Sequence, residues 1–142
     1  MASPDKIDAA IQDMVTRLST ISAVENKTVT VYDHEQMAHA HEKLMSPCIG
    51  VLYNRLQGVG DKGGAANLFV DCVVIYSDEA SDSVSSAQPS ALGLLWDMIQ
   101  SVLTKSAGDR DWFYVTGSPL EHDGKLAYMQ RWRTRITILQ NS

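Results

Sequence analysis

Histidines are the first residues of this 142-residue chain that could hold a metal ion. His34, His39 and His41 lie close together in the segment HEQMAHAHE, with Glu35 and Glu42 beside them. The spacing does not match H-E-x-x-H, the pattern that turns both histidines to one face of a helix. His39 and His41 are two residues apart and therefore do not share a helix face. We expect solvated polar side chains on a connecting segment here, with no metal site and no cofactor.

Phosphate binding and nucleophilic catalysis also lack their usual patterns. The glycine-rich segment GVGDKGG (58–64) is neither a P-loop nor a dinucleotide-binding turn, and a strand pattern follows it instead of a helix. It predicts the tip of a β-hairpin, where Asp61 and Lys62 could contact a neighbouring molecule. Cys48 and Cys72 each lie in an apolar run, which predicts reduced core residues. We expect a protein without catalytic residues.

The most distinctive charged residues are Arg131, Arg133 and Arg135, which alternate with other residues in the last strand pattern. In a strand they project from one face, about 6.6–7 Å apart. Like charges at this distance repel each other unless carboxylates or a polyanion lie opposite them. Three interpretations remain open: a solvated sheet face, a contact with carboxylates of a neighbouring subunit, or nucleic acid passing nearby.

Acidic residues supply candidate partners for these arginines. Asp71 lies within the apolar run LFVDCVV, so we expect it either to pair with an arginine of the last strand or to lie on the open face of a sheet. Asp78, Glu79 and Asp82 belong to a serine-rich segment, and we expect a mobile acidic loop over 78–89. These four acids are the candidates for a plus-to-minus contact between subunits.

The composition predicts a single globular domain, 1–142. Hydrophobic residues make up 44% of the chain and charged residues 20%, which are ordinary values for such a domain. The net charge of −5 argues against a general nucleic-acid binder or a binder of anionic membranes. MASPDKIDAA contains no apolar signal segment, and no run approaches the ~20 apolar residues of a membrane span. We therefore expect no membrane partner.

Two amphipathic helices are predicted to hold these residues in place. The first runs from about residue 4 to 19, and its apolar stripe contains, at helical spacing, Ile7, Ile11, Met14 and Leu18. Its polar side includes Asp13 and Arg17. The second begins at Pro89, and its apolar stripe contains Leu92, Leu95, Trp96, Ile99 and Leu103. Trp96 is accordingly expected to be buried.

Strand patterns account for most of the remaining chain. They cover 28–33, 48–57, 67–77, 112–116 and 126–139, and 34–45 is a candidate short helix. Gly117, Ser118 and Pro119 are predicted to form a turn. Because the connections are short, antiparallel pairing is favoured. The predicted fold class is α+β: an antiparallel sheet of four to five strands with two main helices packed on one face.

This order of elements resembles the tail terminator, or tail completion, proteins of tailed bacteriophages. The similarity lies in a helix, IDAAIQDMVTRL, a strand, TVTVYDH, a proline-introduced strand, SPCIGVLYNRLQG, its partner, NLFVDCVVIYSD, a second helix, LGLLWDMIQSVL, and a closing strand, KLAYMQRWRTRITIL. It covers nearly the full chain, and it is a pattern of elements and not a diagnostic motif.

The resemblance implies a structural subunit that assembles as a ring, typically a hexamer, at the head-proximal end of the tail. The implied partners are further copies of the chain, the tail tube protein and a head-completion or neck protein, with the tail sheath as a further candidate. DNA would pass through the channel without specific recognition. The implied location is the virion, after synthesis in the host bacterial cytoplasm, and no catalysis or cofactor is implied.

Three alternatives remain open beside this hypothesis. One is another head-tail connector or minor tail subunit. A second is a small-ligand or peptide-binding α+β module outside viruses. A third is a hydrolase or nuclease that uses Asp71 or the histidines.

Overall fold

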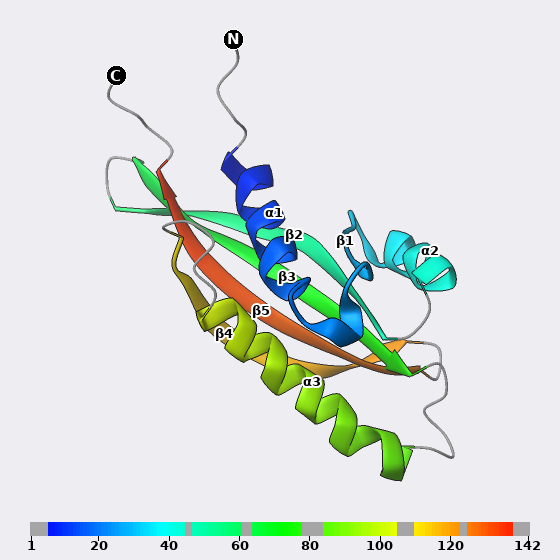
Figure 1. The fold of residues 1–142 in the computed structure, drawn as a ribbon. Helices are drawn as coiled ribbons and strands as arrows, with labels where there is room; N and C mark the ends of the chain where they lie inside the picture. Colours follow the sequence, from blue (N-terminus) through cyan, green and yellow to red (C-terminus); the bar gives the residue numbers. More distant parts are fainter. Residues whose placement is uncertain are drawn as a thin grey trace.

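The computed structural model describes residues 6–44, 47–60, 64–77, 84–104, 110–122 and 125–137. The elements follow one another as α1 (Lys6–Leu18), a short 3-10 helix (Ser22–Val24), β1 (Thr28–Thr30), α2 (His34–Leu44), β2 (Cys48–Val59), β3 (Ala65–Ser77), α3 (Val84–Thr104), β4 (Trp112–His122) and β5 (Lys125–Thr137). Figure 1 shows a long twisted sheet with α1 and α3 crossing the same face.

The five strands form one sheet in the order β1-β2-β3-β5-β4. The pairs β2–β3, β3–β5 and β4–β5 are antiparallel, as expected from their short connections. The α+β class is therefore confirmed, but the prediction of a purely antiparallel sheet is wrong, because β1 pairs with β2 in parallel. The reason is α2, which carries the chain back along the sheet before β2 begins, as a parallel crossover requires.

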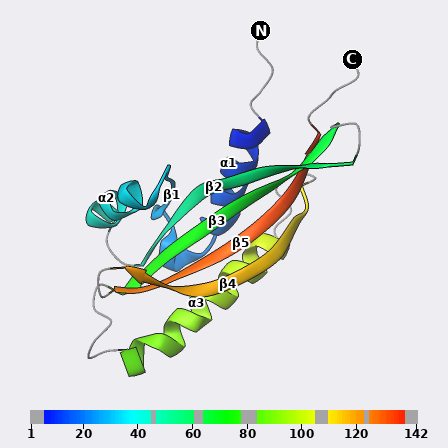
Figure 2. The same cartoon turned by 180° about the vertical axis from the view of Figure 1, so that it is seen from behind.

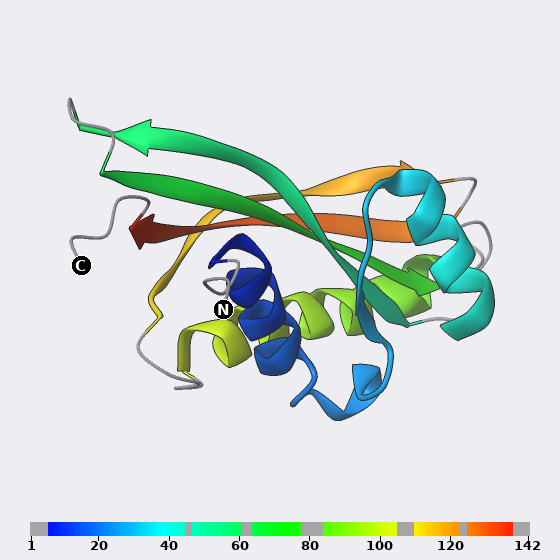
Figure 3. The same cartoon turned by 90° about the horizontal axis from the view of Figure 1, so that it is seen from above.

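Helices cover the two faces of the sheet unequally. Seen from above, α1 and α3 lie on one side of it (Figure 3), which confirms the expected packing of the two main helices. The core on that side contains, among others, Met14, Leu18, Val51, Val70, Cys72, Met98 and Trp132. The third helix, α2, packs on the other face near β1, in a smaller cluster of Val31, Met37, Cys48, Leu52, Val73, Ile75 and Ala127.

The helix α1 follows its predicted apolar stripe but not its predicted polar side. Met14 and Leu18 are fully buried, as expected. Arg17 was expected to face solvent, and this prediction is wrong, because only 3% of the residue is exposed. The end of α3 and the start of β4 lie over this side of α1, so its last turn is enclosed.

The helix α3 differs more from its prediction. It begins at Val84, so 84–89, which were expected to belong to the acidic loop, are helical, while 78–83 lie outside the described residues. Trp96 was expected to be buried, and this is wrong, because 61% of it is exposed. The residues that pack inward are Ala91, Leu94, Met98 and Val102. With about 100° between successive residues, the apolar side chains of this helix span a wider arc than the sheet can cover. The predicted stripe lies on the part of this arc that is turned away from the sheet.

Three details of the strands also differ from expectation. β1 is shorter than 28–33, and β4 extends through Gly117, Ser118 and Pro119, which were predicted to form a turn. Proline is tolerated there because β4 is an edge strand, so its missing N–H need not pair with a neighbour. β2 contains a bulge between Tyr53 and Arg55. Beyond the bulge, each side chain points to the face opposite to the one that simple alternation predicts.

Candidate functional site

The surface of interest is the part of the sheet that no described helix covers. Figure 2 shows this face from behind, with α2 at one end only. We call it the open face and define it by Arg55, Phe69, Asp71, Phe113, Arg131, Arg133 and Arg135. The even-numbered residues of β5 from Tyr128 to Ile136 are buried. The predicted alternation of β5 is therefore confirmed, and its three arginines lie on the open face.

Asp71 is the partner of Arg131 within the chain. The two residues are direct neighbours across β3 and β5. Arg131 Nε donates to Asp71 Oδ1 at 2.8 Å, and Arg131 Nη2 donates to Asp71 Oδ2 at 3.1 Å. Asn54 Nδ2 donates to the same Oδ2 at 3.1 Å. Both expectations for Asp71 are confirmed, since it pairs with an arginine of the last strand and lies on the open face.

This two-point contact has an electrostatic consequence. The hydrogen bond to Asp71 is the largest cause that raises the pKa of Arg131; partial burial lowers it, and the charge of Asp71 raises it. Arg131 is therefore a fixed cation whose charge is balanced inside the chain. Arg133 and Arg135, in contrast, have no described carboxylate within ion-pair distance.

Arginine and phenylalanine side chains alternate across four strands of the open face. Arg55 is paired with Phe69, Phe69 with Arg133, and Arg133 with Phe113. The guanidinium carbon of Arg55 lies 4.5 Å from the centre of the Phe69 ring, and that of Arg133 lies 4.9 Å from the centre of the Phe113 ring. Phe69 is only 8% exposed, whereas Phe113 is 49% exposed. We call these four residues the arginine–phenylalanine row.

Sequence patterns did not identify three members of this row. Arg55 follows the β2 bulge, so its face could not be assigned by simple alternation. Phe69 and Phe113 lie within predicted strands, where no sequence motif distinguishes them. The alternation becomes visible only when the strand order and register are known. The other predicted contact residues, Asp61, Lys62, Asp78, Glu79 and Asp82, lie outside the described residues.

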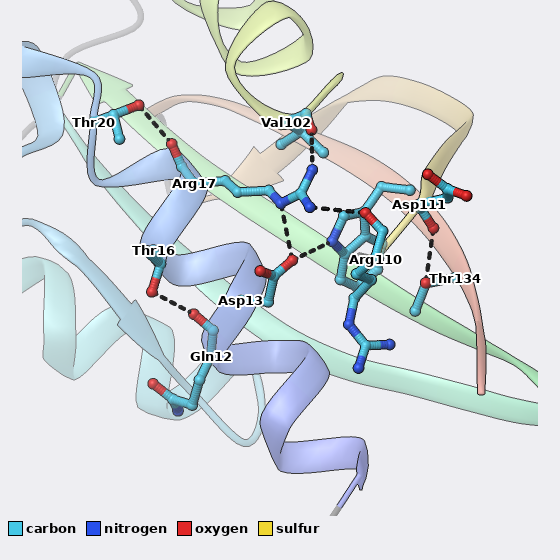
Figure 4. Close-up of polar contacts among 10 residues, drawn as sticks. Gln12, Asp13, Thr16, Arg17, Thr20, Val102, Arg110, Asp111 and Thr134 are labelled. Carbon is cyan, nitrogen blue, oxygen red and sulfur yellow. Dashed lines mark hydrogen bonds and ion pairs between the residues drawn. The ribbon is translucent and has the colours of Figure 1, made fainter. Parts of the chain in front are cut away.

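A buried polar network lies on the opposite, helix-covered side of the sheet (Figure 4). Arg17 Nε donates to Asp13 Oδ2 at 2.9 Å, and Trp112 Nε1 donates to the same oxygen at 2.8 Å. Arg17 also donates to two backbone carbonyls, at 2.6 Å to that of Val102 and at 2.8 Å to that of Arg110. These bonds join α1 to the last turn of α3 and to the start of β4.

The role of this network is structural. Carbonyl groups in the last turn of a helix have no partner within the helix, and the Arg17 guanidinium satisfies one of them in α3. Each of the three nitrogens of the Arg17 guanidinium donates a hydrogen bond to an acceptor of the fold. The sequence signal that could have found it is the i, i+4 spacing of Asp13 and Arg17.

Cys48 and Cys72 are both buried and neither forms a disulfide, as expected. Burial raises the pKa of the Cys72 thiol far above its ordinary value, and the negative charge of the neighbouring Asp71 raises it further. A thiol in this environment stays protonated and is a poor nucleophile. Cys72 is therefore a buried core residue with an unreactive thiol.

A second set of exposed apolar side chains lies on α3 and on the edge strand β4, two elements that contact each other. Leu92, Trp96 and Leu103 on α3 are between 51% and 61% exposed, and Tyr114 and Val115 on β4 are 42% and 44% exposed. We call these five residues the α3–β4 side. Tyr114 also contacts the buried Trp132 edge to face, with ring centres 5.2 Å apart, so this side continues directly into the core.

Other kinds of site find little support in the described part of the chain. No group of three histidine, cysteine, aspartate or glutamate side chains lies together among the described residues. None of the described helices is both long and apolar enough to cross a membrane. Comparison with known protein families and with curated proteins gives no match.

Proposed function

We propose that this protein is a structural subunit that assembles with copies of itself, as a ring at the head-proximal end of a bacteriophage tail. In this role it would end growth of the tail tube and offer a joining surface to the head or neck. The order of elements along the sequence supports the tail terminator hypothesis, and the exposed surfaces support assembly.

The observation that carries the proposal is the α3–β4 side. Leu92, Trp96 and Leu103 lie within about 40° of one another around α3, and large apolar side chains exposed together in this way mark protein contacts. The backbone edge of β4 lies at the end of the sheet, and no strand among the described residues pairs with it. Unpaired edges and apolar patches are both stabilised when another molecule covers them.

Fewer of the three β5 arginines are available for contacts between subunits than the sequence suggested. Asp71 and Arg131 neutralise each other within one chain, so an assembly does not need them as a pair. That Arg133 and Arg135 contact acids such as Asp78, Glu79 and Asp82 of a neighbouring copy stays a prediction. A plus-to-minus contact of this kind, repeated around an axis, closes a ring.

Molar mass measured by light scattering, together with negative-stain imaging, tests the proposal. We expect a multiple of the 15.6 kDa chain mass and ring-shaped particles. Trp96→Glu places a charge on the α3–β4 side and should dissociate these particles with little loss of folding. Thr104→Glu is the matched control, because it adds the same charge at an exposed position on the polar side of the same helix.

Two results would count against assembly. One is a monomer at all concentrations, both alone and with tail tube protein added. The other is equal dissociation of the Trp96→Glu and Thr104→Glu variants, since assembly would then not depend on the apolar residues. A ring that forms but does not associate with tail tubes would favour another head-tail connector.

A further inference from the structure

The open face concentrates positive charge on a protein that is acidic as a whole. Among the described residues that define it, four are arginines, at positions 55, 131, 133 and 135, and one is an acid, Asp71. The whole chain has a net charge of −5, so the remaining surface is negative. Because Asp71 balances Arg131, the cations available to a partner are Arg55, Arg133 and Arg135.

Two of these cations are held in place by aromatic rings. Arg55 is exposed and covers Phe69, so its outward side faces solvent. Arg133 lies over Phe113, and the Phe113 residue remains 49% exposed. A guanidinium fixed over a ring has lost part of its rotamer freedom before any partner arrives, which lowers the entropic cost of binding.

We propose that the open face binds single-stranded nucleic acid. In this interaction Arg55, Arg133 and Arg135 contact the phosphate backbone. The outward sides of Arg55 and Arg133, together with the accessible part of Phe113, form the surface on which unpaired bases stack. The inference does not rest on the proposed role in tails, because every residue that it uses belongs to one chain. It competes with the predicted contact of Arg133 and Arg135 with acids of a neighbouring copy, since the same cations cannot bind both partners at once.

The aromatic partners favour nucleic acid over an acidic protein segment. A carboxylate binds the N–H edge of a guanidinium and makes no use of the accessible face of the guanidinium or of the phenyl ring beside it. Unpaired bases stack on aromatic rings and on guanidinium planes, and they use both parts of the arginine–phenylalanine row. Single strands are favoured over duplexes, because a double helix buries the faces of its bases in its own stack.

The net negative charge sets the expected strength of binding. Neutralising phosphates releases counterions, and each contact with a single strand changes the slope of log K against log salt by about −0.7. Three arginines therefore predict a slope near −2. Binding without sequence preference should fall in the range of about 10⁻⁴ to 10⁻⁶ M at physiological salt, and tighten as salt is lowered.

Fluorescence anisotropy of the full chain with a labelled oligothymidylate of about 20 nucleotides tests the inference, since this exceeds a single-strand site of ~16 nucleotides. Arg133→Ala should weaken binding at least about fivefold and make the salt slope less steep by about 0.7. Arg133→Lys keeps the charge but not the planar group, so the salt slope should persist while affinity falls.

Matched controls separate this effect from folding and from assembly. Arg110 is not part of the open face, and its side chain extends away from the Arg17 network in Figure 4. The Arg110→Ala variant should therefore bind the oligonucleotide as the parent chain does. Trp96→Glu should also bind normally, even if it no longer assembles. Failure of the ring proposal would therefore leave this result unchanged.

Three results would overturn the inference. The first is no binding by the parent chain, or binding by the Arg133→Ala variant that equals that of the parent chain. The second is equal affinity for a duplex of the same length, which would exclude base stacking. The third is displacement of the oligonucleotide by polyglutamate at equal charge, which would identify an acidic protein segment as the partner instead.

Discussion

At the scale of single residues, Arg17 shows how a charged side chain becomes part of a core. Its position on α1 is polar by sequence pattern, yet it is 3% exposed. It is tolerated because a carboxylate and two carbonyls surround the guanidinium. Burying a charge is costly unless such partners are complete, so removal of one member should cost more than an ordinary surface substitution.

Arg17→Met is predicted to lower the free energy of unfolding by about 3–5 kcal/mol, because it leaves Asp13 as an uncompensated charge in the interior. Chemical denaturation measures this loss. Gln12→Ala, at an exposed neighbouring position, should change stability by no more than about 0.5 kcal/mol. Combining Arg17→Met with Asp13→Asn should recover part of the loss. Additive effects in this double-mutant cycle would show that the pair is not coupled.

At the scale of elements, the close approach of α2 to the sheet depends on a glycine. A Cβ atom added to Gly50 would overlap Met37 Sδ and would lie 3.0 Å from Val31 Cγ2. Met37 is fully buried on α2, and Val31 follows β1, so the missing side chain makes room for the whole smaller cluster. The parallel pairing of β1 with β2 belongs to the same arrangement.

Gly50→Ala is predicted to destabilise the protein by about 1–3 kcal/mol through overpacking of this cluster. Thermal or chemical unfolding measures the change, and Met37→Ala in the same chain should restore part of it by opening space. Gly58→Ala is the control, since nothing lies within 4 Å of a Cβ atom at that position. If the two glycine variants lost the same stability, the cause would be backbone conformation and not the contact with α2.

At the scale of the whole molecule, the two faces of the sheet have different relations to their surroundings. One is closed by α1 and α3, and α3 presents a second apolar surface outward. The other carries the arginine–phenylalanine row. A subunit with an apolar side and a separate cationic face can contact two different partners at once, as a component of a larger assembly must.

Assembly through the α3–β4 side predicts that stability depends on concentration. A partner that binds only the folded chain shifts the unfolding equilibrium by mass action, so the melting temperature should rise with protein concentration. Differential scanning fluorimetry over a wide concentration range measures this effect. Trp96→Glu should abolish the dependence, and Met98→Ala should lower the melting temperature at every concentration because Met98 is fully buried. A melting temperature independent of concentration in the parent chain would contradict assembly.

The sequence by itself determined the elements and much of the class of fold. Local periodicity placed α1, α2, β2, β3 and β5 close to their observed bounds, because helix and strand repeats depend on near neighbours. It also determined that the three arginines of β5 share one face. It could not determine which part of the wide apolar arc of α3 faces inward, so Trp96 was wrongly expected to be buried.

Only the tertiary structure decided the sites. The arginine–phenylalanine row exists because β5 is inserted between β3 and β4 and because a bulge turns Arg55 to the open face. Arg17 is buried because α3 and β4, more than 80 residues along the chain, close over it. Such contacts depend on strand order, register and layer packing, which join distant segments and leave no periodic trace in either segment alone.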